Sequence, residues 1–524
     1  MKMASNILTR IPPLFSDLSK ILDGEIDCTH TTLSSYASNG SPFFIMPQAV
    51  MYPKNVTDIK HILAFAREYR MPVTVRGNGN SPNGGSLGEG IVIDMSRYFN
   101  HIRNVNMIEN TITVDAGVPV QFLLEKLHSW QFDIPVLTAQ NKDSTIGAVV
   151  ANKSTSTSSF HHGTIREWIE GVTVVVDNGE EHNIADGITP SGRLLGIYQS
   201  VFPLLTKENP TLRASKPTSH DDPTGYNLWS TSIGPRQLIE QLTGSEGTLG
   251  IITSVTFRIS PHKKHTTTLS IPIAEKKFLP TAIEMAKHHN AEHIFLYDTT
   301  VMHLANRHHP GLVPFFNDSL YVLLVTHSSD DEEKLHYATK AFKKTISQIQ
   351  INIEIEETDS SATITEPQFL NSLYALYTNA TLIPISAADG IIIEGGLVPS
   401  FLEEAEQYLD SLGNLYTITG NIGSGHINIT TLFDPKSESF DASIADYSRR
   451  IFSIVKKYNG GISASGGEGL SRTPFVSKVY GDATIAIFKK IKDAWDPLSI
   501  LNPGKKIGTT THYLSQHIKR ILPS

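Results

Sequence analysis

The stretch RGNGNSPNGG at residues 76–85 decides how this chain is expected to fold. It lies between two runs, residues 71–75 and 90–94, whose β-branched and apolar residues are typical of strands. Glycine has no Cβ and reaches positive φ readily, so the N–H groups of such a loop can lie bare against a ligand. Successive N–H groups curled into a nest suit a pyrophosphate. We therefore predict a phosphate-binding loop between two strands.

Other glycine motifs fit this stretch less well. A dinucleotide fingerprint needs its third glycine where Pro82 stands and a helix directly afterwards, whereas a strand follows here. A P-loop needs a Gly-Lys-Ser/Thr ending, which the stretch lacks. GGSLG at residues 84–88 matches the letters of a nucleophile elbow, but its serine is not between a strand and a helix. A hairpin loop without a ligand stays open at this point, because Gly/Asn-rich turns are common.

Length and composition indicate an ordinary globular protein of several domains. The 524 residues are too many for one hydrophobic core, so we expect two or three domains. Hydrophobic residues at 40% and charged residues at 18% are typical of globular chains, and a net charge of -8 argues against a nucleic-acid surface. The single cysteine, Cys28, excludes an intrachain disulfide framework, a cysteine-ligated iron–sulfur cluster and a CxxCH haem site.

The hydropathy pattern predicts a cytoplasmic protein. No run of 18 or more apolar residues is present, so we expect no transmembrane segment. Residues 1–22 lack the continuous apolar region of a secretory signal. Residues 513–522 could form a short basic amphipathic helix, and peripheral contact with a membrane stays open for that reason.

Periodicity predicts the elements around the first loop. Asn55 is expected to cap a helix on which Ile59, Ile62, Leu63 and Ala66 share one face. Further along, we expect strands at residues 111–116, 172–176 and 255–259 and a helix at residues 120–127.

The composition shifts near residue 262, where we place a domain boundary. Beyond it, helices such as residues 280–288 alternate with strands such as residues 320–326 and 391–393. This alternation predicts an α+β domain with a mainly antiparallel sheet.

Two further stretches have the composition of cofactor loops. DSTIGAVVAN at residues 143–152 combines small residues with hydroxyls, and TGSEGTLGIIT at residues 243–253 leads into a strand. In series, the three stretches resemble the vanillyl-alcohol-oxidase type of FAD flavoprotein, also called the PCMH-type FAD fold, over roughly residues 45–260. The resemblance implies that the first loop contacts the pyrophosphate and that residues 244–253 lie beside the isoalloxazine ring.

The resemblance also implies an architecture and a set of cofactor contacts. We expect an α+β protein with a two-subdomain FAD-binding domain at residues 45–261 and a substrate-holding cap at residues 262–490. An N-terminal segment at residues 1–44 precedes them, and a segment at residues 491–524 returns to the FAD domain. The residues implied to bind FAD are Gly77, Asn78, Gly79, Asn80, Ser81, Gly85, Ser144, Thr145, Gly147, Asn152, Glu246, Gly250, Ile251 and Asn502.

Three stretches are similar to one branch of that superfamily, the D-lactate, glycolate and D-2-hydroxyglutarate dehydrogenases. They are residues 501–505 (LNPGK), 420–430 and 224–228 (TGYNL). The similarity implies an oxidoreductase that transfers a hydride from a hydroxyl-bearing carbon of a small-molecule substrate to flavin N5. A protein base would take the hydroxyl proton.

The chain departs from the superfamily at the attachment point of the flavin. Many oxidases of this kind carry a histidine, bonded covalently to FAD, where this chain has Asn80. Since an amide is not a nucleophile, we predict noncovalent FAD.

The chain also departs from the dehydrogenase branch at its metal motif. The branch carries GHxGDGNxH and a later SxEHGxG, and the ligand positions are here Asn421, Asn428 and Ser465, with Gly466 in place of the second motif's histidine. Amides and a hydroxyl are poor ligands for a zinc-like ion. We therefore expect no metal in that motif and metal-independent flavin reduction.

Three residues are candidates for catalysis. His426 lies in the same loop and titrates near neutrality, which suits a general base, and Glu468 lies in the facing glycine loop. Arg472 matches a family arginine that could bind a carboxylate bidentately. A buried structural histidine and a surface ion pair are the ordinary alternatives. Tyr374 and Tyr377 share the face of an expected helix, where core packing is the ordinary use.

Two other functions stay open. An oxidase of sugars, polyols or aldonolactones on the same fold would need no metal. A flavin-binding protein whose catalytic site has decayed would keep its FAD loops beside altered substrate motifs. The electron acceptor is not readable from the sequence; oxygen, a quinone and a carrier protein all fit.

Overall fold

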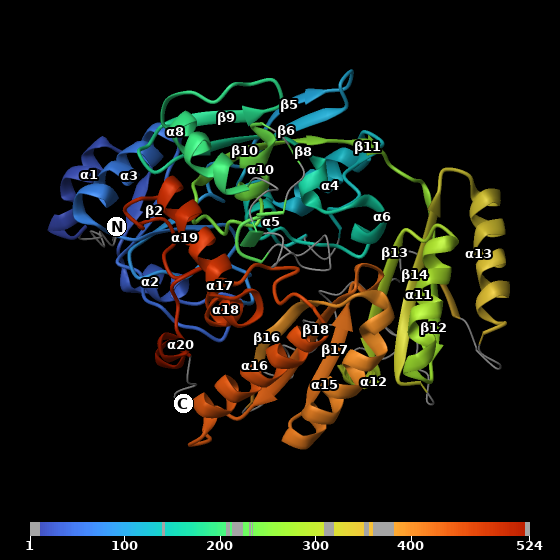
Figure 1. The fold of residues 1–524 in the computed structure, drawn as a ribbon. Helices are drawn as coiled ribbons and strands as arrows, with labels where there is room; N and C mark the ends of the chain where they lie inside the picture. Colours follow the sequence, from blue (N-terminus) through green and yellow to red (C-terminus); the bar gives the residue numbers. More distant parts are fainter. Residues whose placement is uncertain are drawn as a thin grey trace, which may run out of the picture.

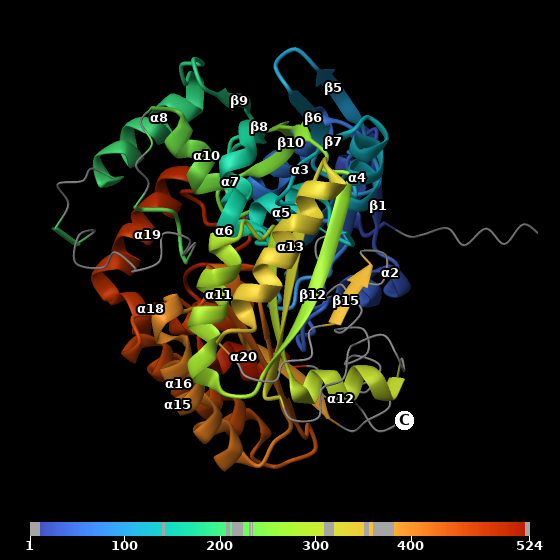
Figure 2. The ribbon, with the colours of Figure 1, turned by 90° about the vertical axis from the view of Figure 1, so that its right-hand side faces the viewer.

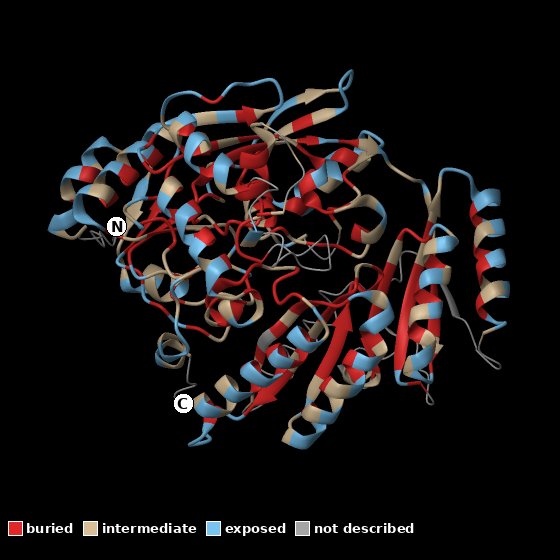
Figure 3. Cartoon of the chain, in the orientation of Figure 1, coloured by how far each residue is buried: buried red, intermediate tan, exposed pale blue. Residues whose placement is uncertain are grey.

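The computed structural model describes residues 11–138, 142–205, 210–211, 224–229, 232, 234–308, 319–349, 356–359 and 382–518. Three sheets of four or more strands organise these residues, two in an upper body and one in a lower body (Figure 1), and a fourth sheet is a single pair of short strands. In Figure 3 the strands are mostly buried, while the outer faces of the surrounding helices are exposed.

The first sheet has four strands and carries the glycine loop. Its order is β1 (Glu25–Asp27), β2 (Ala49–Tyr52), β4 (Ile91–Asp94) and β3 (Val73–Arg76). β4 runs parallel to both β2 and β3, whereas β1 is antiparallel to β2. The loop at residues 77–90 connects the parallel strands β3 and β4 directly.

Helix α3 (Val56–Tyr69) covers this sheet as the periodicity predicts. The side chain of Asn55 accepts a hydrogen bond from the N–H of Asp58, which caps the helix at its first residue. The predicted apolar face, Ile59, Ile62, Leu63 and Ala66, is buried against the sheet. This prediction is confirmed.

The second sheet is antiparallel and has five strands. Its order is β5 (Ile102–Asn106), β6 (Thr111–Asp115), β10 (Ile251–Arg258), β8 (Ile169–Val175) and β9 (Glu181–Ala185). The predicted strands at 111–116, 172–176 and 255–259 all belong to it, and the predicted helix at 120–127 is α4 (Val120–Ser129). The described part of this region also contains helices α5 (Ile146–Ala151), α6 (Ser159–His162), α7 (Ile165–Trp168), α8 (Gly192–Val201) and α10 (Arg236–Leu242).

The third sheet forms the cap, and all its strand pairs are antiparallel, which confirms the prediction. Its order is β15 (Glu356–Asp359), β12 (His265–Ile273), β14 (Tyr321–Ser329), β13 (His293–Asp298), β17 (Tyr416–Gly420), β18 (His426–Phe433) and β16 (Ile383–Ile392). Helices α11 (Leu279–His288), α13 (Glu332–Ile346), α15 (Val398–Leu412) and α16 (Phe440–Lys457) lie to the left of β12 in Figure 2.

Alternation along β18 decides which side chains face these helices. Ile427 and Ile429 join the core cluster that contains the apolar faces of α15 and α16. Successive side chains on a strand point to opposite faces of the sheet. His426, Asn428 and Thr430 therefore lie on the other face.

Both ends of the described chain pack on the first sheet. β1 pairs with β2, and Phe15 and Leu18 lie in the core cluster of that sheet. After the cap, α19 (Asp482–Trp495) packs on α8, and Leu501 forms a parallel bridge with Val73. The domain limits given above stay a prediction.

Two predictions fall wholly or partly outside the described residues. Tyr374 and Tyr377 are not among them. The predicted terminal helix at 513–522 corresponds to α20 (Thr511–His517), beyond which only Ile518 is described. Within the described part of the chain, no helix combines the length and apolarity needed to cross a membrane.

Candidate active site

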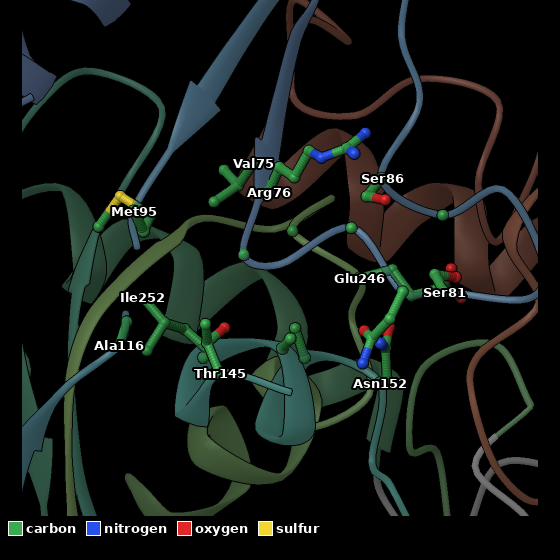
Figure 4. A pocket seen from close by; sticks show the side chains of 18 of the residues that line it. Val75, Arg76, Ser81, Ser86, Met95, Ala116, Thr145, Asn152, Glu246 and Ile252 are labelled. Carbon is green, nitrogen blue, oxygen red and sulfur yellow. The ribbon is translucent and has the colours of Figure 1, made fainter. Parts of the chain in front are cut away.

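A pocket lies where the three glycine-containing stretches meet (Figure 4). In Figure 4, Ser81, Asn152 and Glu246 gather at one end, and Met95, Ala116 and Ile252 lie at the other. The lining residues are Val75, Arg76, Gly77, Gly79, Asn80, Ser81, Gly85, Ser86, Met95, Ala116, Thr145, Gly147, Ala148, Ala151, Asn152, Glu246, Gly247, Gly250 and Ile252.

Close approach between loops explains why glycine is needed at the pocket wall. A Cβ on Gly77 would lie 2.2 Å from the hydroxyl of Thr145, and one on Gly147 would lie 2.9 Å from the Cβ of Ala116. Gly79 has φ +71°, and a Cβ there would lie 2.2 Å from Nη2 of Arg76. The close approach of Thr145 and Arg76 therefore requires glycine at positions 77 and 79, and the N–H groups there carry no Cβ that would hold an anion off.

Amide side chains fix the first loop against the second. Asn78 donates to the carbonyl of Asp143 at 2.9 Å, and Asn80 donates to the same carbonyl at 3.2 Å and to the hydroxyl of Ser144 at 3.0 Å. Two loops that are about 65 residues apart in sequence thus form one wall. Asn80 sits at the pocket edge, where an amide cannot form a covalent bond to a flavin.

Asn502 joins the first loop to the third stretch. Its Nδ2 donates to the carbonyls of Gly85 at 2.9 Å and Glu246 at 2.6 Å, and its Oδ1 accepts from Thr74 at 3.1 Å. Asn502 is buried and has φ +42°, so its place in the C-terminal return is closely constrained. Asn502 thereby holds together two segments that line the pocket, those of Gly85 and Glu246.

The structure places ten of the fourteen predicted FAD contacts on the pocket wall. The other four, Asn78, Ser144, Ile251 and Asn502, lie directly behind or beside it. Their roles toward FAD stay a prediction. The sequence reasoning missed Arg76, although it directly precedes the loop, and it missed Met95 and Ala116, whose sequence context carries no cofactor signal.

Arg76 supplies a cation to the pocket. Its Nη1 donates to the carbonyls of Tyr36 at 3.2 Å and Ser38 at 3.0 Å, and its guanidinium lies 4.8 Å from the centre of the Tyr36 ring. These contacts hold the guanidinium beside Gly79. Arginine in this position suits a bound phosphate oxygen.

His426 lies between the cap and the FAD domain. It is buried, and its Nδ1 is 3.0 Å from the hydroxyl of Thr155, in the chain segment that follows the pocket residue Asn152. Its Nε2 is buried without a hydrogen-bond partner among the described residues. Burial, and then the charge of Lys153, lower the pKa of His426 to about 3, so the imidazole is neutral. Lys153, buried with φ +43°, was not singled out from the sequence.

Glu468 is part of a buried charge network behind the pocket. Its carboxylate contacts Nζ of Lys506 and accepts from the N–H of Gly225. Glu246, which lines the pocket, accepts from the N–H groups of Glu468 at 2.7 Å and Gly469 at 2.8 Å and lies 3.4 Å from Lys506. Burial of two carboxylates around one ammonium raises the pKa of Glu468 to about 8. These contacts favour a positioning role for Glu468.

Arg472 is the last residue of the short helix α17 (Gly469–Arg472), which follows the glycine loop, and it is buried. Its Nη1 donates to the carbonyls of Ser465 at 2.8 Å and Gly467 at 3.0 Å, so one arm of the guanidinium holds the glycine loop. Burial lowers the pKa of Arg472, and the nearby carboxyl of Asp389 opposes that shift. Binding of a substrate carboxylate by Arg472 stays a prediction, and the hydrogen bonds of Nη1 do not favour it.

Asn83 is a connection that the sequence reasoning missed. Its side chain donates to the carbonyls of Gly466 and Gly467 at 3.2 Å each and accepts from Ser471 at 3.0 Å. The fully buried Asn83 thus ties the first FAD loop to the glycine loop of the cap. Partners nearly 400 residues apart leave no local signal in the sequence.

The three positions of the altered metal motif come from the facing strand and loop of the cap. The side chain of Asn428 accepts from the N–H of Gly390 at 2.7 Å, and the hydroxyl of Ser465 accepts from the N–H of Thr155 at 3.5 Å. Asn421 is buried at the end of β17. Two of these side chains therefore hold backbone groups, which is an ordinary use of an amide or a hydroxyl.

Comparison with known families accounts for both bodies of the molecule. Residues 47–185 match the family described as the FAD binding domain, and residues 263–506 match the FAD linked oxidases, C-terminal domain. The chain belongs to the FAD-linked oxidase family. Its cofactor is accordingly FAD, and the expected α+β flavoprotein fold is confirmed.

Relatives of this FAD-linked oxidase are distant in sequence. It is 24% identical over 521 residues to the D-2-hydroxyglutarate dehydrogenase of Escherichia coli, matching 91% of this chain but 50% of that protein. It is 25% identical over 496 residues to the glycolate oxidase subunit GlcD of Bacillus subtilis, matching 90% and 91% of the two chains. The chain thus spans about half the length of some curated relatives that it matches.

Solved structures agree on the fold. The 4-ethylphenol oxidase from Gulosibacter chungangensis superposes with a TM-score of 0.70 at 16% identity, covering 95% of this chain and 97% of that one. An alkyldihydroxyacetonephosphate synthase superposes with a TM-score of 0.66 at 14% identity, covering 95% and 85%. At such low sequence identity, these structural similarities are evidence for the fold only.

Proposed function

We propose that this protein is an oxidoreductase that uses noncovalent FAD to oxidise the hydroxyl-bearing carbon of a small hydroxy acid, without a metal ion in the altered motif. One observation carries the proposal. The neutral imidazole of His426 is held against Thr155, three residues after the pocket residue Asn152, and its buried Nε2 has no partner among the described residues. A substrate hydroxyl that reached this nitrogen would be its first hydrogen-bond partner among these residues.

His426 would act as the base in one tautomer. With the proton on Nδ1 donated to Thr155, the lone pair of Nε2 can accept a hydrogen bond and then the proton of the hydroxyl. Its pKa of about 3 makes the free imidazole a weak base. A substrate anion beside it raises the pKa, so binding and proton transfer are coupled.

The pocket residues would orient FAD. The bare backbone at Gly77 and Gly79 and the guanidinium of Arg76 fit a pyrophosphate, and the apolar residues Met95, Ala116 and Ile252 fit a ring. When bound, FAD supplies the hydride acceptor. Acid precipitation of the purified protein should leave the flavin in the supernatant; flavin that stays with the denatured chain would contradict noncovalent binding.

A second candidate is the oxidation of an uncharged alcohol, such as a sugar or polyol. This candidate is favoured because Nη1 of Arg472 already donates to two backbone carbonyls. Arg472 is therefore less suited to bind a substrate carboxylate through both arms of its guanidinium. A flavin-binding protein with a decayed catalytic site would have the same pocket, but no substrate would reduce its flavin.

Anaerobic mixing with a panel of 2-hydroxy acids, sugars, polyols and aldonolactones distinguishes these functions. We expect flavin absorbance to bleach with a 2-hydroxy acid. Bleaching by uncharged alcohols alone supports the second candidate, and bleaching by none contradicts both. Reoxidation with oxygen, a quinone or a carrier protein then identifies the electron acceptor. We further propose that the protein is cytoplasmic, with a small molecule as its substrate.

A further inference from the structure

A cluster of three potential ligands lies where the chain leaves the FAD domain for the cap. His128 is in the last turn of α4, Asp133 ends the short strand β7 (Phe132–Asp133), and His262 follows β11 (Ser260–Pro261). One ligand atom from each side chain lies within 4.8 Å of the other two. In Figure 1, β11 lies beside α4, at the point from which the chain runs down to the cap. We call these three residues the junction cluster.

Backbone hydrogen bonds hold the three residues close to one another. β11 pairs with β7 in the register Ser260 to Asp133, and the N–H of His262 donates to the carbonyl of Gln131 at 3.0 Å. Gln131 has φ +63° and forms the tight turn between α4 and β7. Three separate stretches therefore converge without depending on flexible loops.

The distances are long for direct hydrogen bonds and close to the spacing of ligand atoms around one metal ion, and Oδ1 of Asp133 keeps a second lone pair while it accepts from the N–H of Ile134 at 2.8 Å. Nε2 of His128 is 3.4 Å from Oδ1 of Asp133, and Nδ1 of His262 is 3.6 Å from its Oδ2. Zinc bonds to histidine and carboxylate measure about 2.0–2.2 Å, which puts tetrahedral ligand atoms about 3.4 Å apart. Nδ1 of His262 is buried and has no hydrogen-bond partner among the described residues.

A neighbouring cluster shows what an ion-pair network looks like at the same junction. His161, His162 and Glu292 also lie within 4.8 Å of one another. There, however, Glu292 contacts both His162 and Lys263 directly and accepts from the hydroxyl of Ser328 at 2.9 Å. Its lone pairs already have partners, and Lys263 would repel a cation. This cluster therefore serves as a matched control.

We propose that the junction cluster binds a zinc-like divalent cation and fastens the start of the cap to the FAD domain. Two imidazoles and one carboxylate suit zinc, cobalt, nickel or copper rather than magnesium or calcium. The side chains are 42%, 23% and 32% exposed for His128, Asp133 and His262, so the ion can enter and water can complete its coordination. The two rings stack at 4.1 Å and 28°, so binding includes rotation of one ring until both lone pairs converge.

The test uses the flavin-containing protein after treatment with a chelator and dialysis. Zn²⁺ is titrated in competition with a chromophoric chelator, and Co²⁺ binding is followed by its visible absorption. We expect one tight Zn²⁺ site in the unaltered protein and also in the His162→Ala variant. We expect a loss in His128→Ala and in His262→Ala that exceeds the about 10- to 100-fold loss typical of removing an outer partner. Asp133→Asn should weaken binding as well.

Two readouts keep the test independent of folding and of flavin chemistry. Circular dichroism and flavin content should match between variants and unaltered protein, and Zn²⁺ should raise the thermal midpoint of the unaltered protein but not of His128→Ala. Absence of a stoichiometric site would overturn the proposal. So would a site that survives in both His128→Ala and His262→Ala, or one lost only in His162→Ala.

Discussion

The FAD pocket and the His426 region of the cap are built in different ways. The pocket wall consists largely of backbone and small side chains from stretches that are each continuous in sequence, such as residues 76–85. The His426 region consists of single side chains brought together from residues 153–155, 426–428 and 465–472. A site made of backbone requires glycine at fixed positions, whereas a site made of side chains can change one residue at a time. This difference is consistent with the resemblance described above, in which the FAD loops match the family pattern and the metal motif does not.

The largest effect should come from filling the backbone-made site. Gly79→Val places a branched side chain at φ +71° against Arg76, so the protein should purify without FAD while circular dichroism stays unchanged. Gly196→Ala is the matched control, because Gly196 has ordinary φ and open space around it. Full flavin content in Gly79→Val would show that this loop does not bind the pyrophosphate.

Removing the proposed base should slow chemistry without removing FAD. His426→Ala should lower the rate of anaerobic flavin reduction by about 10²- to 10⁴-fold, the usual contribution of a general base. Flavin content should not change, since His426 does not line the pocket. Stopped-flow absorbance measures the rate, and a reduction rate equal to that of the unaltered protein would exclude His426 as the base.

The charge network that joins the two regions should matter for stability. Lys506→Met removes the ammonium that lies between Glu246 and Glu468 and should lower the free energy of unfolding by about 3 kcal/mol, because a buried carboxylate is then left without its cation. Lys489→Met is the control, since its pair with Asp493 is exposed and should contribute below about 1 kcal/mol. Urea unfolding compares the two, and equal losses would contradict the assigned role.

The same network predicts a pH dependence. The pKa of Glu468 is raised from 4.5 to about 8, so the folded protein binds this proton more tightly than the unfolded chain. Its contribution to stability is complete below pH 4.5 and is lost as the pH rises to about 8. The free energy of unfolding should therefore fall across this window, and Glu468→Gln should make the fall smaller. An equal slope in the variant would exclude Glu468 as its source; Asp298 and Asp389, with pKa values raised to about 7, act in the same direction.

The sequence was sufficient for much of the fold and for most of the pocket. Apolar periodicity and the cap at Asn55 predicted α3, and the resemblance of the three loops to the PCMH-type FAD fold implied ten residues that line the pocket. Contacts between residues far apart in sequence could not be predicted. Examples are the hydrogen bond from Asn83 to the carbonyl of Gly467 and the ion pair between Glu246 and Lys506. The hydrogen-bond partners of Arg472 could not be predicted either, because they are backbone carbonyls, which every residue has.

The most direct test of the central claim is anaerobic flavin reduction by a 2-hydroxy acid before and after treatment with a strong chelator. The claim is that FAD is reduced without a metal ion at Asn421, Asn428 and Ser465. We expect the same reduction rate in both samples, and the same in His128→Ala, which lacks the junction cluster. Reduction that is lost on chelation and restored by zinc, manganese or cobalt in His128→Ala would contradict the account.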